Sequence, residues 1–134
     1  MEKKFKRELK SLEKISRFIS EFITTSNIDD SHTISINLVV EELFTNMVKY
    51  NAENKNDISI SLNKDGSRLI ISLTDFDVEP FDVSKTGEVN VDQLLEDRKP
   101  GGLGIHIVKK FVDKIDYQYK NRQSKITLIR MLEE

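Results

Sequence analysis

The sequence predicts an α+β protein in which the helices cover one face of a sheet. Apolar residues recur at helical spacing in 11–23 and 34–47. They alternate with polar residues in four further segments, 57–63, 67–75, 115–121 and 124–132. The expected order is strand, helix, helix, hairpin, loop, helix, hairpin. We therefore expect a two-layer α/β sandwich with a mixed or antiparallel sheet.

Two amphipathic helices are predicted in the first half of the chain. Ser11 is the expected N-cap of the first, and the polar run 24–27 ends it. Its apolar positions are Leu12, Ile15, Phe18, Ile19, Phe22 and Ile23. Ser31 is the expected cap of the second helix. The apolar positions of that helix include Ile34, Ile36, Leu38, Val39, Leu43 and Met47.

The predicted strands are short and are joined mostly by tight turns. A first strand is expected where Phe5, Arg7 and Leu9 alternate with charged residues. The run Asn63-Lys64-Asp65-Gly66 carries the Asp-Gly signal of a hairpin turn. The two segments from residue 115 onward form a second hairpin that ends the chain.

Length and composition narrow the class of protein. We expect a single domain over residues 1–134, with a mobile lid at 83–100 because this connection is long and rich in Asp, Glu, Lys and Gly. There is no cysteine, and no run approaches the ~20 apolar residues of a membrane span. A net charge of −2 gives no basic field for direct binding of nucleic acid. These features predict a cytoplasmic protein that contacts no membrane.

One local charge cluster remains open to two interpretations. It consists of Lys3, Lys4, Lys6, Arg7 and Lys10. It is either a solvated edge or a partner-binding patch.

The segment 40–51 carries the first candidate site residues. Glu42 and Asn46 are four residues apart, so their side chains are neighbours on a helix surface. The carboxylate could orient or deprotonate a hydroxyl, and the amide oxygen could ligate a hard cation such as Mg²⁺. Lys49, one turn beyond Asn46, could contact a phosphate or be solvated. The Glu-x-x-x-Asn spacing also arises by chance in amphipathic helices.

A glycine-rich turn precedes the last predicted helix. Gly101, Gly102, Leu103 and Gly104 lead into an apolar run, where backbone N–H groups and the helix dipole could receive phosphate. The segment matches neither the G-x-x-x-x-G-K-[ST] loop nor the G-x-G-x-x-G fingerprint. A glycine-rich helix entry is the alternative.

An acidic turn, residues 73–82, follows the second strand of the first hairpin. Asp75 and Asp77 lie near the strand end, where a carboxylate could accept a hydrogen bond from an exocyclic amine such as that of adenine. Aspartate is also common in ordinary turns.

Taken in order, the three segments resemble the N, G1 and G2 boxes of the Bergerat-type ATPase domain. That domain is shared by gyrase, the ninety-kilodalton heat-shock chaperone, histidine kinases and the mismatch-repair ATPases. The chain is most similar to the small bacterial anti-sigma factors that are also serine protein kinases. The resemblance implies ATP and Mg²⁺ as cofactors, Glu42 as catalytic base, Asn46 as Mg²⁺ ligand and the backbone of 101–104 as phosphate cradle.

The G1 segment departs from the family pattern, which reads Asp-x-Gly. Aligning on Pro80-Phe81-Asp82 puts Phe76 where the aspartate belongs and Val78 where the glycine belongs. A one-residue shift then leaves Asp75 or Asp77 as the adenine reader. We favour Asp75 because it is the last residue of the predicted strand. A Cβ at the glycine position could narrow the approach of the backbone to the base.

The resemblance also implies partners. A kinase of this branch phosphorylates a serine on an anti-anti-sigma partner and sequesters a sigma factor, and a homodimer is left open. The alternative is a non-catalytic module of the same fold that sequesters a regulator, with ATP structural or absent. The missing G1 glycine favours that alternative. A chaperone or histidine-kinase fragment would need a transducer or dimerisation domain besides these 134 residues.

Overall fold

The computed structural model describes residues 1–50, 53–78 and 108–132. A helical turn at 108–111 precedes the last hairpin. The remaining helices and strands, in chain order, are β1 (Glu2–Phe5), α1 (Ser11–Thr25), the 3-10 helix η1 (Asp30–His32), α2 (Thr33–Tyr50), β2 (Ile58–Asp65), β3 (Arg68–Phe76), β4 (Lys114–Lys120) and β5 (Gln123–Met131).

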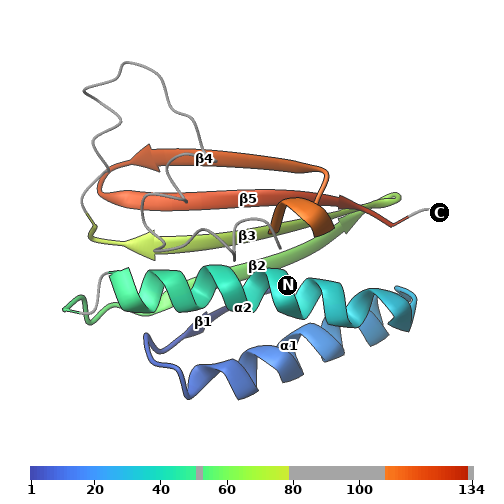
Figure 1. Ribbon diagram of the computed structural model, residues 1–134, viewed down its shortest axis with the longest axis horizontal. Helices are drawn as coiled ribbons and strands as arrows, with labels where there is room; N and C mark the ends of the chain where they lie inside the picture. The colour runs from blue at the N-terminus through green and yellow to red at the C-terminus, as the bar shows by residue number, and fades with distance from the viewer. Residues whose placement is uncertain (51–52, 79–107, 133–134) are drawn as a thin grey trace.

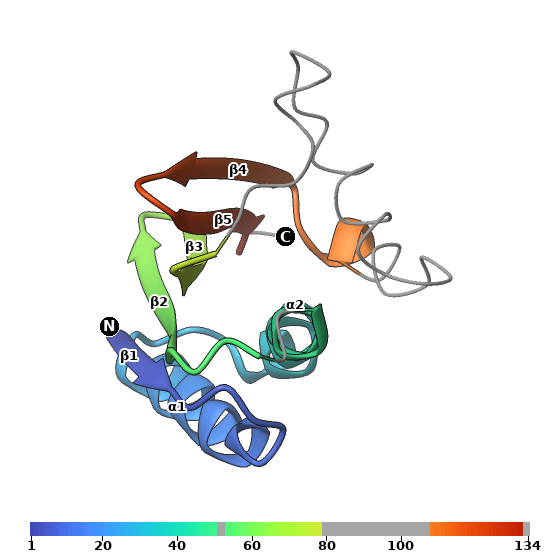
Figure 2. The ribbon, with the colours of Figure 1, turned by 90° about the vertical axis from the view of Figure 1, so that its left-hand side faces the viewer.

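The strands form one five-stranded sheet in the order β1-β2-β3-β5-β4. Every neighbouring pair is antiparallel. Helices α1 and α2 lie on the same side of this sheet (Figures 1 and 2). The predicted two-layer α+β sandwich is therefore confirmed. Of the mixed and antiparallel sheets that the sequence allowed, the structure has the antiparallel one.

The core lies between the sheet and the two helices. Alternation within each strand sends every second side chain toward the helices. Two cross-strand rows on that face are apolar and at most 1% exposed; they are Ile60, Leu73 and Ile126, and Leu62, Ile71 and Leu128. Helix α1 adds Ile15, Phe18, Ile19, Phe22 and Ile23, and α2 adds Ile36, Val39, Val40, Leu43, Phe44 and Met47.

The first strand is shorter than predicted. It ends at Phe5, whose ring packs edge-on against Phe18 with the centroids 5.5 Å apart. Arg7 and Leu9 lie beyond the strand, and Leu9 is half exposed. The alternation was misleading here because Arg7 is withdrawn from the sheet by contacts with other elements, which are described with the site below.

Both predicted helix caps were wrong. Lys10 occupies the N-cap position of α1 without a side-chain hydrogen bond. The Ser11 hydroxyl instead donates back to the Lys6 carbonyl at 2.7 Å. At the second site the Asp29 carboxylate accepts from the Ser31 N–H at 2.8 Å, so Asp29 caps η1. In both places a local side-chain to backbone bond competes with the expected cap.

Both predicted hairpins are confirmed. The β2–β3 turn lies slightly later than expected, because Asp65 and Arg68 are still paired across it. Gly66 takes a φ of +64° there, which suits glycine. The β4–β5 turn uses Asn121 and Arg122, both with positive φ.

Some predictions fall on residues outside the described ones. These are the lid at 83–100 and the glycine-rich turn at 101–104. Among the described residues, no helix is both long and apolar enough to cross a membrane. The assignment of 1–134 to a single domain stays a prediction.

Candidate functional site

Glu42 and Asn46 lie on one face of α2, as the spacing predicted. Both side chains are half-buried, whereas Lys49 is exposed. They flank the apolar stripe that packs on the sheet, which includes Leu43 and Met47 at 1% exposure. A carboxylate and an amide at the border of the core are supported by packing yet can still meet a ligand.

Asp75 lies in a cross-strand row in which the helix-facing side of the sheet carries polar side chains. Alternation along β3 puts it on the same side as Leu69, Ile71 and Leu73, and it is 1% exposed. Its cross-strand neighbours are Ile58 on β2 and Ser124 on β5. A charged group in this position needs partners, because burying an unpaired charge is costly.

Arg7 connects Asp75 to α2. One guanidinium nitrogen, Nη2, donates to Asp75 Oδ1 in a buried ion pair. Nη1 donates to the Met47 carbonyl at 2.9 Å, and Nε donates to the Asn56 carbonyl at 3.2 Å. Arg7 therefore bridges the strand-end carboxylate and the backbone of α2 at Met47, the residue after Asn46.

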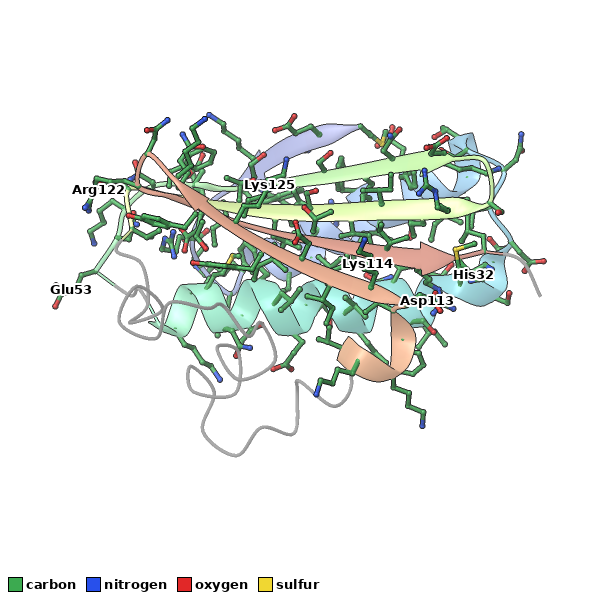
Figure 3. All side chains as sticks on the ribbon, turned by 90° about the horizontal axis from the view of Figure 1, so that it is seen from above. His32, Glu53, Asp113, Lys114, Arg122 and Lys125 are labelled. Atoms are coloured by element: carbon green, nitrogen blue, oxygen red, sulfur yellow. The ribbon has the colours of Figure 1, made fainter. Side chains whose placement is uncertain are left out.

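Asp77 points elsewhere. It follows the end of β3 with a φ of +58°, and its carboxylate pairs with Arg122 Nε at 2.8 Å in an exposed ion pair. Figure 3 shows Arg122 at one end of the sheet, far from His32 and Asp113 at the other. The two candidate aspartates therefore differ sharply in burial, and Asp75 is the one that faces the helices.

Two residues at this end of the sheet were missed by sequence reasoning. Ser124 is 4% exposed, and its hydroxyl oxygen has no hydrogen-bond partner among the residues that the structure describes. Tyr119 pairs with Ser124 across β4 and β5, and its hydroxyl donates to the Val78 carbonyl at 2.7 Å. Alternation could have revealed Ser124, because it shares a face with Ile126 and Leu128, where an apolar residue is expected.

The predicted phosphate cradle comes just before the helical turn at 108–111 in the sequence. Gly101, Gly102, Leu103 and Gly104 lie outside the described residues. The helical turn 108–111 agrees with a helix after the glycines, and Val108 is fully buried. The Phe111 carbonyl accepts from Arg130 Nη1 at 2.6 Å, which ties this turn to β5.

The donors present fit a magnesium nucleotide. No group of three or more His, Cys, Asp or Glu residues in the described part of the chain could hold a metal ion alone. A single amide oxygen from Asn46 is nevertheless enough where phosphates and water supply the other ligands, as Mg²⁺ commonly requires. At the other end, the Asp75 carboxylate and the unpartnered Ser124 hydroxyl offer hydrogen-bonding groups suited to a purine.

A separate groove lies outside this site. It has a volume of about 830 Å³, lies between β1 and α1, and is lined in part by Phe5 and Phe18. Six basic residues line it, Lys3, Lys4, Lys6, Lys10, Lys14 and Arg17, together with four acidic ones. Lysines on an exposed edge strand such as β1 hinder pairing with another chain. Within the basic cluster, Lys3, Lys4, Lys6 and Lys10 are exposed as a solvated edge would be, whereas the Arg7 side chain is buried.

Comparison with known proteins gives a family and a fold. The pattern of the histidine kinase-like ATPase domain matches residues 5–130. A chain in the crystal structure of the SiaB–SiaC complex from Pseudomonas aeruginosa is similar, with a TM-score of 0.64 and 13% identity, over 97% of this chain and 87% of that one. At this identity the likeness concerns the fold. A search of curated proteins found no match.

Proposed function

The chain belongs to the family of histidine kinase-like ATPase domains, and we propose that it binds ATP with Mg²⁺ and phosphorylates a serine on a partner protein. The observation that carries this proposal is that Arg7 joins the buried Asp75 carboxylate to α2 at Met47, the residue after Asn46. This arrangement brings a base-reading carboxylate close to the helix that carries a metal ligand and a general base.

The base end of the site is built on the polar row of the sheet. Asp75 would accept from the exocyclic amine of adenine, and the Ser124 hydroxyl lies beside it on β5. Both groups are held by strands, so their positions are well defined. Tyr119 on β4 is the last residue of this row, and its hydroxyl is held by a hydrogen bond to the Val78 carbonyl.

The phosphate end is built on α2. Asn46 would contribute an oxygen to Mg²⁺, and the backbone of 101–104 would hold the phosphates. The bound nucleotide supplies the phosphoryl group. Glu42, one turn before Asn46, would orient and deprotonate the attacking serine hydroxyl. Lys49 is exposed one turn further along and could contact a phosphate.

A partner of the anti-anti-sigma type is the proposed substrate, and a sigma factor is the proposed sequestered protein. The similar fold in a chain of the SiaB–SiaC complex supports a protein partner. In this proposal residues 1–134 act as one cytoplasmic domain, with the lid in 83–100.

One observation favours a second function, a protein-binding module of the same fold that does not transfer phosphate. The family glycine falls at Val78 in the alignment on Pro80-Phe81-Asp82 and at Asp77 when Asp75 is the base reader, so a side chain stands there in either alignment. A side chain there can narrow the base pocket. ATP would then be structural or absent, and the chain would act by sequestration.

Titration with nucleotide tests the binding step. Wild-type protein should bind Mg-ATP in calorimetry, and Asn46→Ala should weaken Mg-ATP more than Mg-free ATP because only the metal contact is lost. Asn37→Ala is the matched control, since Asn37 lies on the same helix and donates to the Thr33 carbonyl at 2.9 Å. If the wild type does not bind ATP at millimolar concentration, the enzyme proposal is excluded and the proposal of a protein-binding module remains.

The transfer step is tested with Glu42→Gln. This change keeps size and hydrogen bonding but removes the base, so phosphorylation of the partner serine should fall by ~10²-fold or more. Nucleotide and partner binding should stay nearly intact. Glu41→Gln, an adjacent half-buried carboxylate on α2, is the control. If the wild type transfers no phosphate to a partner that it binds, sequestration is the better account.

A further inference from the structure

Arg7 is almost completely enclosed although it lies in a connection between two elements. Its side chain is 3% exposed, and the side chain of its partner Asp75 is 1% exposed. All three guanidinium nitrogens donate: to Asp75, to the Met47 carbonyl and to the Asn56 carbonyl. The residue therefore joins the β1–α1 connection to α2, to the segment before β2 and to the end of β3.

This enclosure has a consequence for the proposed base pocket. With 1% of its side chain exposed, Asp75 offers almost no surface that a base could contact in this state. The guanidinium bond to the carboxylate is charge-assisted, so it is stronger than a bond from a neutral amine. A base amine that donates to Asp75 Oδ1 must therefore compete with the Arg7 guanidinium for that atom.

We propose that Arg7 is a latch that regulates nucleotide binding by holding the base-reading carboxylate. This inference rests on the proposed function, because it concerns the same pocket. In the latched state Asp75 is engaged by Arg7, and in the open state it accepts from the base. The apparent affinity is then the intrinsic affinity reduced by the fraction of molecules that are open.

The position of the latch connects it to the N-terminal elements. Arg7 lies in a tight turn, in which the Glu8 N–H donates to the Lys6 carbonyl at 2.8 Å. The Ser11 hydroxyl, at the start of α1, donates to the same carbonyl. Because both ends of this turn are held by β1 and α1, a movement of either element would pull the guanidinium from Asp75. The N-terminal elements can thus control a pocket built by β3 and α2.

Substitution of Arg7 tests the latch directly. Arg7→Gln keeps a hydrogen-bond donor but removes the charge, and Arg7→Lys keeps the charge but loses the planar fork. Arg68→Gln is the matched control, because Arg68 makes an exposed ion pair with Asp65 at the other end of β3. Calorimetry with Mg-ATP on folded protein, checked by circular dichroism, should show binding roughly threefold tighter or more for Arg7→Gln. Arg7→Lys should lie between it and the wild type, and the control should match the wild type.

The outcomes separate the latch from the proposed function. Equal or weaker binding by both Arg7 variants, with clear binding by the wild type, overturns the latch and leaves nucleotide binding intact. No binding by the wild type or by any variant overturns the proposed function, and the latch with it. Tighter binding confined to the Arg7 variants supports both.

A measurement on the wild type covers the case in which the Arg7 variants fold poorly. The Arg7 Nε–H donates to the Asn56 carbonyl, so its hydrogen exchange can be followed by NMR. Saturating Mg-ATP should accelerate that exchange by releasing the side chain. A purely structural Arg7 would exchange at the same rate or more slowly with nucleotide bound, and that result would overturn the latch.

Discussion

Two arginine–aspartate pairs lie at the same end of β3, and they differ in almost every physical respect. The Arg7–Asp75 pair has side chains that are 3% and 1% exposed. The Arg122–Asp77 pair has side chains that are 51% and 67% exposed, with 2.8 Å between Arg122 Nε and Asp77 Oδ1. The two aspartates are only two residues apart in the sequence.

The backbone explains why such close neighbours have different surroundings. Asp75 still belongs to β3, so alternation sends its side chain into the helix layer. Asp77 follows the strand with a φ of +58°, which turns the chain toward the β4–β5 hairpin. Asn54 stabilises this turn by donating to the Phe76 carbonyl at 2.9 Å. Burial, more than the identity of the partner, therefore determines what each pair contributes.

The largest effect should come from breaking the buried pair. Arg7→Ala removes a charged donor from the buried Asp75 carboxylate and a donor from each of two backbone carbonyls, so the free energy of unfolding should fall by about 3–5 kcal/mol. Arg122→Ala removes an exposed pair and should cost about 0–1 kcal/mol. Urea denaturation of both variants measures the difference.

A double substitution sharpens this result. Arg7→Met combined with Asp75→Leu replaces the pair by apolar side chains and should recover much of the lost stability. Equal effects of Arg7→Ala and Arg122→Ala would show that burial does not separate the two pairs.

The next largest effect concerns nucleotide binding. Asp75→Asn should weaken the binding of ATP by about 1–3 kcal/mol, because the buried charged acceptor for the adenine amine is lost. Asp77→Asn should leave affinity nearly unchanged, since that carboxylate faces solvent and Arg122. Calorimetry on the two variants gives the comparison. Loss of binding by Asp77→Asn alone would identify Asp77 as the reader.

A smaller effect is expected from the backbone under the exposed pair. Arg122 has a φ of +61°, a conformation that costs a residue with a Cβ about 1–2 kcal/mol and costs glycine little. Arg122→Gly relieves this cost but loses the ion pair and gives the unfolded chain more freedom. Thermal unfolding should therefore show a change within about 1 kcal/mol. A loss as large as that of Arg7→Ala would mean that the turn depends on the Arg122 side chain.

The smallest effect involves a third aspartate, which is exposed and has no arginine partner in the described contacts. The Ser31 N–H lowers the pKa of Asp29 below its ordinary value of 3.8, and the Ser31 side chain and His32 add to this shift. A lowered pKa contributes stability that is present above 3.8 and is lost as pH falls through the folded-state value. Asp29→Ala should therefore slightly lower the free energy of unfolding at pH 7. The difference in this free energy between the variant and the wild type should shrink near pH 3. A difference that does not change with pH would contradict this.

Local sequence pattern correctly predicted the two hairpins and the faces of α2 and β3 that carry the candidate residues. The hairpins are confirmed because alternation and turn residues act over a few positions. The helical face of Glu42 and Asn46 follows from spacing alone. The inward direction of Asp75 follows from its place in the alternation of β3. The family resemblance depended on the same local motifs, in order along the chain.

Contacts between distant segments could not be predicted from pattern. Arg7 looked like part of a first strand and one of a group of solvated cations, yet it is enclosed by residues 40, 49 and 68 positions away. The Ser124 hydroxyl became part of the candidate site only through its pairing with β3. The predictions of the helix caps were wrong because a short polar side chain has several backbone partners within a few residues, and local pattern does not show which one it binds.

The sequence by itself therefore determined the elements, their order and the residue types of the candidate site. It did so because periodicity reports which side of a helix or strand is buried. Only the tertiary structure decided which of two neighbouring aspartates is enclosed and which arginine each one meets. Burial depends on how β1, α2, β3 and β5 pack together, and burial is what makes the loss of one partner costly in one ion pair and nearly neutral in its neighbour.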